Sequence, residues 1–278
     1  ADFFFIQRNW ALKEIKMDKV FKYCDLKSAG TIKLLKDFEL FFNEPKTFND
    51  PFDSFVEFDF TATLQDWKNY FKKMRMPPDK VKQGIDNIKR GVKYDLSSLQ
   101  QPSTLKISCF SEEPDNMLLW SHYGSKHTGI CIGFKVYQEF RSNCIHLSSR
   151  DLKVTEPSVP QGTIPLVKVN YDINMPRPYN RIIGEDSKRL MEFVKTKSKS
   201  WEYEKEYRAI VNSDLVINNP IHFDPTEITD LIFGLNTTDA DIQNVKDIVS
   251  TYPSSGNWLN LFKCERAKSK YEIILKKI

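Results

Sequence analysis

The sequence predicts an α+β fold in which a mixed, mainly antiparallel sheet is flanked by helices. Short segments with the alternation typical of half-buried strands recur from Val20 to Leu275, and helical periodicity occurs between them. Strands and helices therefore interleave along the chain, and many of the strands are short, which favours this class. With 278 residues, of which 40% are hydrophobic and 13% aromatic, the chain can bury a sizeable core.

The predicted elements follow one another without an internal repeat. Strands are expected at 20–23, 40–42, 56–61, 105–110, 129–134, 166–171, 204–211, 228–233, 259–264 and 271–275. Ser28 is the expected N-cap of the first well-defined helix, and further helices are expected at 115–123, 188–199 and 239–249. Asp2 to Asp18 is interpreted as a helix or an extended arm.

We expect a single domain, residues 1–278, with a helical insertion at 64–95. Apolar residues such as Trp67 and Ile85 recur at helical intervals on either side of Pro77-Pro78, which breaks the insertion into two helices. Its basic side chains are a candidate nucleic-acid surface, although an ordinary solvated helix face has the same composition. These side chains are Lys68, Lys72, Lys73, Arg75, Lys80, Lys82, Lys89 and Arg90.

Charge and cysteine usage favour a cytoplasmic protein without membrane contact. The 41 basic and 37 acidic side chains leave a net charge of +4, too small for a global attraction to nucleic acid. The five cysteines include no C-x-x-C pair, which indicates reduced thiols. No apolar run approaches the roughly 18 to 20 residues that span a bilayer. The segment Phe3 to Ile6 also lacks the basic leader of a signal peptide.

Most of the suggestive chemistry lies between Leu105 and Phe134, where two predicted strands bracket a short helix. Ser111 and Pro114 are the expected start of that helix, and Gly124 is its end. The cluster is either a binding site for a planar ligand, by stacking and hydrogen bonding, or a polar lid on the core. The side chains expected together at one mouth of the sheet are Trp120, Ser121, His122, Tyr123 and His127.

Metal binding and serine catalysis are less well supported by this stretch. Cys109, His122, His127 and Cys131 have the spacing C-x12-H-x4-H-x3-C, which superficially suits zinc. Both cysteines lie in apolar strand patterns, however, and no tight pair of ligands anchors the set. No serine lies in a G-x-S-x-G context, and the chain has neither a P-loop nor a Rossmann glycine pattern.

A second candidate group is acidic and lies in the predicted strand at 204–211. Strand alternation would place Glu204, Glu206 and Arg208 on one face, with the two carboxylates about 7 Å apart. Arg208 would hold one acid ionised, while the other hydrogen-bonds a sugar hydroxyl or stabilises positive charge developing at a ribose carbon. An exposed strand face of alternating charges has the same pattern.

Five motifs occur along the chain in this order: FNDPFD, ISCFSE, LLWSHYGSKHTGICIGF, WEYEKEYR and DLIFGLN. In these motifs the chain resembles a widespread bacterial family of unknown function that is often found beside mobile elements and defence genes. The resemblance covers roughly Val20 to the C-terminus, and the insertion is its variable part.

The layout of these motifs is also similar to that of ADP-ribosyltransferases. The similarity implies a split sheet that binds NAD as a co-substrate, with a late glutamate that hydrogen-bonds the nicotinamide ribose. It implies Glu204, Glu206 and His122 as the catalytic residues. Lys22 and Tyr23 stand where the strict pattern has a histidine or arginine. The implied NAD-binding residues are Lys22, Tyr23, Ser111, Trp120, Tyr123 and Arg208.

The implied function is that of an NAD-dependent ADP-ribosyltransferase, or an NAD glycohydrolase-like effector, in an antiphage defence or toxin system. Its target would be a nucleic acid or a protein. One alternative is a nucleic-acid-binding module, non-catalytic or nucleolytic, that uses the basic helices at 68–90. Another is a sensor domain that binds a partner encoded in the same operon.

Overall fold

The computed structural model describes residues 17–92, 105–153, 162–184 and 188–278. The expected helix or arm at Asp2 to Asp18 lies almost entirely outside the described residues. The chain divides into two compact units. Unit 1 comprises Ala1–Glu44, Thr104–Val169 and Ser200–Ile278, and unit 2 comprises Pro45–Ser103 and Asn170–Lys199.

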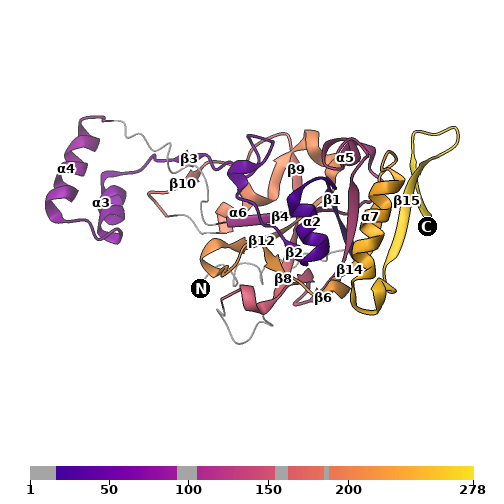
Figure 1. Ribbon diagram of the computed structural model, residues 1–278. Coiled ribbons are helices and arrows are strands. Elements are labelled where there is room, and N and C mark those ends of the chain that lie inside the picture. Colours follow the sequence, from indigo (N-terminus) through magenta and orange to yellow (C-terminus); the bar gives the residue numbers. More distant parts are fainter. Residues whose placement is uncertain (1–16, 93–104, 154–161, 185–187) are drawn as a thin grey trace. The chain divides into compact units, whose positions relative to one another are not determined.

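Unit 1 is built on a ten-stranded mixed sheet, which confirms the predicted α+β class (Figure 1). Neighbouring strands pair antiparallel, except that β14 and β15 are parallel. The last two strands form the predicted C-terminal hairpin. The order across the sheet is β16 (Ile273–Lys277), β15 (Asn260–Arg266), β14 (Ile228–Phe233), β5 (Ile130–Lys135), β1 (Lys19–Cys24), β4 (Leu105–Ser111), β12 (Glu206–Asn212), β8 (Thr163–Lys168), β7 (Ser142–His146) and β6 (Tyr137–Glu139).

The sheet is almost divided between β1 and β4. β1 pairs with β5 at six positions and β4 pairs with β12 at seven, but β1 meets β4 only at Phe21 and Ser111. Beyond that pair, Lys22 Nζ donates to Ser108 Oγ at 3.0 Å and to the Cys109 carbonyl at 3.1 Å. A lysine side chain therefore occupies the place where ladder hydrogen bonds would otherwise join the two strands.

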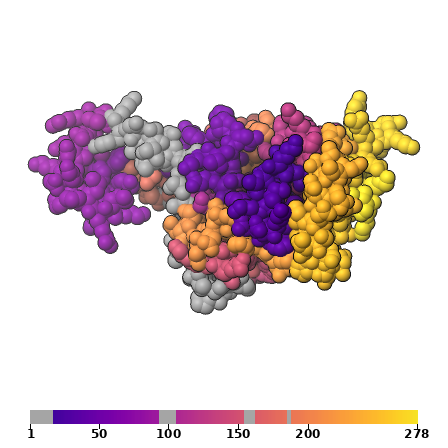
Figure 2. Space-filling view, viewed as in Figure 1, coloured from indigo at the N-terminus to yellow at the C-terminus, as the bar shows by residue number. Residues whose placement is uncertain are grey.

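Helices cover both faces of this sheet. Leu35 of α2 and Val245 of α7 belong to the main apolar core on one face, and the two helices contact each other. Figure 2 shows that both helices lie at the surface of the molecule. On the opposite face, Trp120 of α5 packs with Cys131 and Cys264. The helices of unit 1 are α2 (Ala29–Lys36), α5 (Met117–His122) and α7 (Asp239–Ser250).

Local capping explains where these helices begin. The Ser28 side chain accepts from a first-turn N–H of α2, as predicted, and Thr238 does the same for α7. The predicted start of the α5 helix at Ser111 is wrong, because Asn116 is its N-cap and accepts from two N–H groups of the first turn. Ser111 instead ends β4.

The predicted strand at 204–211 begins two residues later than expected. Glu204 ends the 3-10 helix η4 (Lys199–Glu204), Lys205 has a φ of 44°, and β12 starts at Glu206. A residue in the left-handed region interrupts the extended alternation. The prediction that Glu204 shares a strand face with Glu206 and Arg208 is therefore wrong, although the latter two do share one.

Unit 2 contains the two helices predicted on either side of Pro77-Pro78. Thr63 and Asp66 form a capping box at the start of α3. Gly84 of α4 packs against the Phe71 ring so closely that a Cβ there would lie 2.9 Å from it. Two parallel strand pairs, β3 with β10 and β9 with β11, complete the unit. Its elements are β3 (Phe58–Asp59), α3 (Leu64–Lys73), α4 (Pro78–Lys89), β9 (Asn170–Asp172), β10 (Tyr179–Asn180), α6 (Lys188–Lys195) and β11 (Thr196–Ser198).

The remaining described elements are short. β2 pairs antiparallel with β13 in unit 1. Their bounds, and those of the remaining 3-10 turns, are β2 (Glu39–Leu40), β13 (Ile221–His222), η1 (Pro45–Thr47), η3 (Ser149–Asp151), η5 (Ser213–Leu215), η6 (Pro225–Glu227) and η7 (Pro253–Gly256).

Glu227 is a buried carboxylate that makes the stability of unit 1 depend on pH. Its Oε1 accepts from the Tyr137 hydroxyl at 3.1 Å, and its buried Oε2 has no partner among the described residues. Burial raises the pKa of Glu227, and this outweighs the opposing hydrogen bond from Tyr137. The folded state therefore binds the proton of this carboxyl more tightly than the unfolded state, in which a glutamate has a pKa of about 4.3. As a result, the free energy of unfolding falls as the pH rises from about 4.3 through the pKa of Glu227 in the folded state.

We expect Glu227→Gln to be more stable than the wild type at pH 7, because it removes a buried charge and keeps an oxygen for Tyr137. The advantage should shrink at pH 4, where the wild-type carboxyl is protonated. Urea unfolding at the two pH values measures both differences. The exposed Glu272→Gln serves as control, and a pH-independent difference for Glu227→Gln would contradict the prediction.

Candidate functional site

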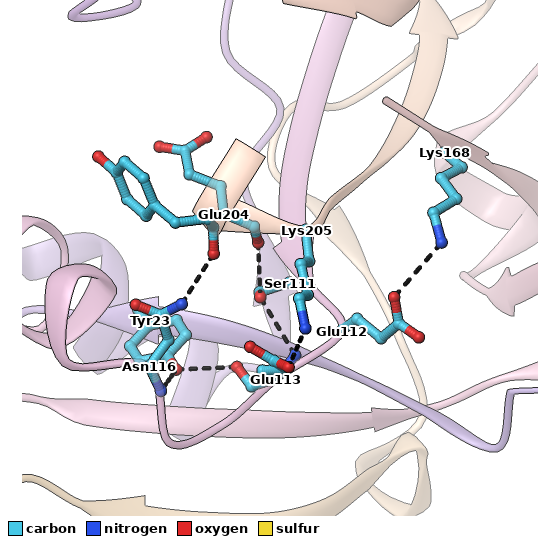
Figure 3. Close-up of polar contacts among 9 residues, drawn as sticks. Tyr23, Ser111, Glu112, Glu113, Asn116, Lys168, Glu204 and Lys205 are labelled. Atoms are coloured by element: carbon cyan, nitrogen blue, oxygen red, sulfur yellow. Dashed lines mark hydrogen bonds and ion pairs between the residues drawn. The ribbon is translucent and has the colours of Figure 1, made fainter. Parts of the chain in front are cut away.

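The candidate site lies where the end of β4, the turn before α5 and η4 meet. Ser111 Oγ donates to the Glu204 carbonyl at 2.7 Å and accepts from the Glu113 N–H at 3.2 Å (Figure 3). Asn116 Nδ2 donates to the Tyr203 carbonyl at 2.7 Å. Ser111 at the end of β4 and Asn116 at the N-cap of α5 thus bind the backbone of η4, and they fix the position from which the Glu204 side chain extends.

The Glu204 carboxylate is the acid at the centre of this site. It is only 4% exposed, and its Oε1 accepts from the Tyr123 hydroxyl at 2.8 Å. Tyr123 is the residue that ends α5, so the helix positions the phenol that orients the acid. A hydrogen bond from a neutral phenol fixes the direction of a carboxylate without cancelling its charge.

Four aromatic rings form a cluster that includes Tyr123, the hydrogen-bond partner of Glu204. The His122 ring centroid lies 6.2 Å from that of Tyr123 and 6.3 Å from those of Trp201 and Tyr203. The Trp201 and Tyr203 centroids are 6.0 Å apart. His122 is exposed and the other three rings are half-buried. Rings at these separations provide a partly exposed surface against which a planar ligand can stack.

Tyr23 and Lys22 are neighbours on β1 and therefore project to opposite faces of the sheet. The Tyr23 hydroxyl donates to the Glu113 carbonyl at 2.8 Å and accepts from the Asn116 N–H at 3.2 Å. Burial raises the pKa of Tyr23 well above its usual value, so the phenol stays neutral and supports the turn before α5. Lys22 Nζ lies 5.2 Å from the centroid of the Phe110 ring, in the main core. The sheet therefore separates Lys22 from the other predicted NAD-binding residues.

Trp120 lies in the core and not at the surface of the site. Its side chain is fully buried, and its Nε1 donates to the Pro114 carbonyl at 3.0 Å. The indole meets the Tyr23 ring edge-on, with centroids 5.1 Å apart, and stacks on His127 at 6.4 Å. A side chain without exposed surface supports α5 but does not stack on a ligand.

Glu206 and Arg208 form a buried ion pair. Arg208 Nε donates to Glu206 Oε1 at 2.8 Å and Arg208 Nη2 to Oε2 at 3.0 Å, and the two residues are 0% and 4% exposed. The adjacent Cys109 is a thiol, because burial and then the charge of Glu206 raise its pKa well above the usual value. Both oxygens of Glu206 are bound by the guanidinium, so this acid and Arg208 tie the start of β12 together by two charge-assisted hydrogen bonds.

The geometry of Ser121 and His127 does not suit a nucleophile and its base. Ser121 Oγ donates to the Met117 carbonyl at 2.9 Å and lies 3.2 Å from His127 Nε2. Because the hydroxyl proton is already bound to a carbonyl, the histidine N–H donates to Ser121. Burial also lowers the pKa of His127, which keeps the ring neutral. A serine nucleophile needs the opposite direction of this hydrogen bond.

The described residues contain no group of three or more histidine, cysteine, aspartate or glutamate side chains that could hold a metal ion. The zinc spacing noted in the sequence therefore does not correspond to a ligand cluster there. Separately, none of the described helices combines the length and apolar character that a membrane crossing requires.

Sequence reasoning missed three residues of the site. Asn116 precedes an apolar run in the pattern of an N-cap, a signal that would have identified it. Trp201 and Tyr203 lie within the WEYEKEYR motif, but the interpretation of that motif rested on its charged residues alone. The predicted strand began only at Glu204, whereas Trp201 and Tyr203 lie before it in η4, so the strand pattern did not place them in the site.

Comparison with known proteins assigns part of the chain. No curated protein and no solved structure is significantly similar to it. The motifs FNDPFD, ISCFSE and DLIFGLN lie outside the region that matches a known family. The motif WEYEKEYR and, from Leu119 onward, the motif LLWSHYGSKHTGICIGF lie inside it. Residues 119–209 match the family described as a protein of unknown function (DUF2971), which confirms the predicted relation to a domain of unknown function.

Proposed function

We propose that this protein binds NAD and breaks the bond between nicotinamide and ribose, with Glu204 as the catalytic acid. The observation that supports the proposal is the Glu204 carboxylate, which Tyr123 orients at 2.8 Å beside the aromatic rings around His122. The reaction would be that of an ADP-ribosyltransferase or an NAD glycohydrolase, and NAD consumption would suit an effector of a defence or toxin system.

The side chains of the site fit the nicotinamide riboside half of NAD. Aromatic faces attract a planar, positively charged ring by stacking and by cation–π interaction. A fixed carboxylate accepts a hydrogen bond from a ribose hydroxyl and stabilises the positive charge that develops at the ribose carbon. NAD supplies the bond that breaks: nicotinamide leaves with the bonding electron pair, and water or a target nucleophile then bonds the ribose carbon.

The other residues act through Glu204. Ser111 and Asn116 bind the backbone of η4 and so position the acid, and Tyr123 orients its carboxylate. His122 is the exposed ring of the cluster and is assigned to ligand contact. The catalytic role is assigned to Glu204 because its partner Tyr123 belongs to the aromatic cluster, whereas Glu206 pairs with Arg208.

The test is release of nicotinamide from NAD by the purified protein, followed by chromatography. Glu204→Gln should lower the rate about 100-fold or more, because a neutral amide does not stabilise developing positive charge. Tyr123→Phe should lower it about 10-fold, since it removes one hydrogen bond to a charged group. Glu202→Gln is the matched control, because Glu202 is an exposed acid in the same 3-10 helix.

Circular dichroism and a melting curve establish that each variant is folded before its rate is compared. The assay is run with and without a bacterial lysate as a source of acceptor, and label from NAD is followed into the protein and nucleic-acid fractions. Equal rates for Glu204→Gln and the wild type would overturn the assignment of the acid. No nicotinamide release from the wild type under either condition would overturn the proposed function.

A further inference from the structure

Positive charge is concentrated in the α3–α4 hairpin of unit 2, residues 64–92. This segment contains eight basic and three acidic side chains, an excess of five positive charges. The whole chain has a net charge of only +4, so the other residues together carry a net charge of −1. The basic character of the protein therefore belongs to this hairpin.

All eight basic side chains of the hairpin are exposed. None of them forms an ion pair with another described residue. Of the three acids, Asp66 is bound in the capping box with Thr63. Figure 2 shows the hairpin in purple, with many of its side chains in view. The charges are therefore available to a ligand and are not neutralised within the hairpin.

The apolar side chains of the hairpin are used to pack its two helices together. Phe71 and Ile85 are buried, and the Trp67 ring centroid lies 5.6 Å from that of Phe71. Gly84 allows the two helices to approach closely. Its large exposed apolar side chains are two at the turn, Met74 and Met76, and one at each end, Leu64 and Val92. A helix that lies in a membrane surface needs a broad apolar face, which this arrangement does not leave.

The lysines are aligned along the helices. Lys68 and Lys72 are four residues apart in α3, and Lys82 and Lys89 are seven apart in α4, so each pair lies on one side of its helix. At about 1.5 Å per residue, the pairs span about 6 Å and about 10 Å. Rows of exposed cations at this spacing suit a polymer that carries regularly repeated negative charges.

We propose that the α3–α4 hairpin binds the phosphate backbone of a nucleic acid. Binding at this surface is electrostatic and does not depend on base sequence, because lysine ammonium groups contact phosphates as point charges. The proposal is independent of the NAD-cleaving site, which lies in unit 1.

The test is a fluorescence-anisotropy titration of the full chain with labelled duplex and single-stranded DNA and RNA of mixed sequence, over a series of salt concentrations. The wild type should bind, and the logarithm of its affinity should fall linearly with that of the salt concentration. The variant Lys68→Gln/Lys72→Gln/Lys82→Gln/Lys89→Gln should bind more weakly, with a duplex salt slope smaller by about 3 to 4. Glutamine preserves helix propensity, and circular dichroism checks that the hairpin remains helical.

The control variant replaces Lys27, Lys36, Lys246 and Lys268 of unit 1 by glutamine. These lysines are exposed and belong to no ion pair with a described residue, so the net charge changes by the same amount. An equal loss of nucleic-acid affinity in this control would overturn the proposal.

Three other results would also overturn it: an unchanged salt slope in the hairpin variant, no binding of nucleic acid by the wild type, and binding to phosphatidylserine vesicles or polyglutamate without binding to nucleic acid. Nicotinamide release should be the same in the hairpin variant and the wild type, which separates this proposal from the proposed function.

Discussion

Arg208→Met is expected to lower the free energy of unfolding by about 3 to 5 kcal/mol, because it removes the guanidinium that binds both oxygens of the buried Glu206 carboxylate. Arg208 has no exposed surface and binds both oxygens of Glu206, at 2.8 and 3.0 Å. Methionine retains much of the apolar volume, so most of the loss reports the charge and the hydrogen bonds of the guanidinium. Urea unfolding at pH 7, monitored by circular dichroism, measures it.

A double-mutant cycle identifies the origin of that loss. Adding Glu206→Gln to Arg208→Met removes the stranded charge and should recover part of the stability. Lys276→Met, which breaks the exposed ion pair with Glu265, should change the free energy of unfolding by less than about 1 kcal/mol. A cost for Arg208→Met no larger than that of the surface control would show that the pair does not stabilise the fold.

Trp120→Ala is expected to cost about 3 to 5 kcal/mol, as is usual when a buried tryptophan is truncated. The indole is fully buried between the Tyr23 and His127 rings, and the variant also leaves the Pro114 carbonyl without its donor. Because α5 rests on this side chain, the loss should appear as a lower melting temperature. Differential scanning calorimetry measures it.

The same helix provides the control for this substitution. Met117→Ala removes a side chain that is 43% exposed and should change the free energy of unfolding by about 0.5 kcal/mol or less. Trp120→Phe should fall between the two, since it keeps an aromatic ring and loses the hydrogen bond. Equal melting temperatures for Trp120→Ala and Met117→Ala would contradict the role of Trp120 in holding α5 on the sheet.

Strong local signals made much of the fold predictable. β14 has the predicted bounds, Ile228 to Phe233, because the apolar residues Ile228 and Leu231–Phe233 are followed at once by Gly234, which marks the end of the strand. The helix at 239–249 was predicted equally well and forms α7. In such segments periodicity, capping and burial all favour one structure, so the sequence alone is sufficient.

The start of β12 shows where local reasoning fails. Lys205 has a positive φ, which no local pattern signals in a lysine. Residues distant in sequence contact Lys205 in this conformation. Its carbonyl accepts from the Glu112 N–H at 3.1 Å, and its ammonium group binds Glu113. Strand periodicity treated Glu204 and Glu206 as equivalent, so the sequence did not indicate which acid pairs with Arg208.

The site was predictable as a meeting of two segments but not in its contacts. The acidic motif and the residues that end α5 were expected together, and the hydrogen bond from Tyr123 to Glu204 joins them. The burial of Trp120 follows from tertiary packing, which the local sequence pattern does not encode. The position of Lys22 on the other face, by contrast, follows from strand alternation, because Lys22 and Tyr23 are neighbours on β1.

The order of the strands constrains how the protein is made. β1 lies between β4 and β5, but the ribosome synthesises the whole of Pro45–Ser103 before either neighbour emerges. The parallel strands β14 and β15 follow all the strands of the other half of the sheet in sequence, so the nascent sheet stays incomplete until Asn260–Arg266 has been synthesised. Pairings between such distant segments form slowly. Newly made β1 therefore has neither of these partners while Pro45–Ser103 is synthesised, and binding by a chaperone during that interval would protect its exposed edges from aggregation.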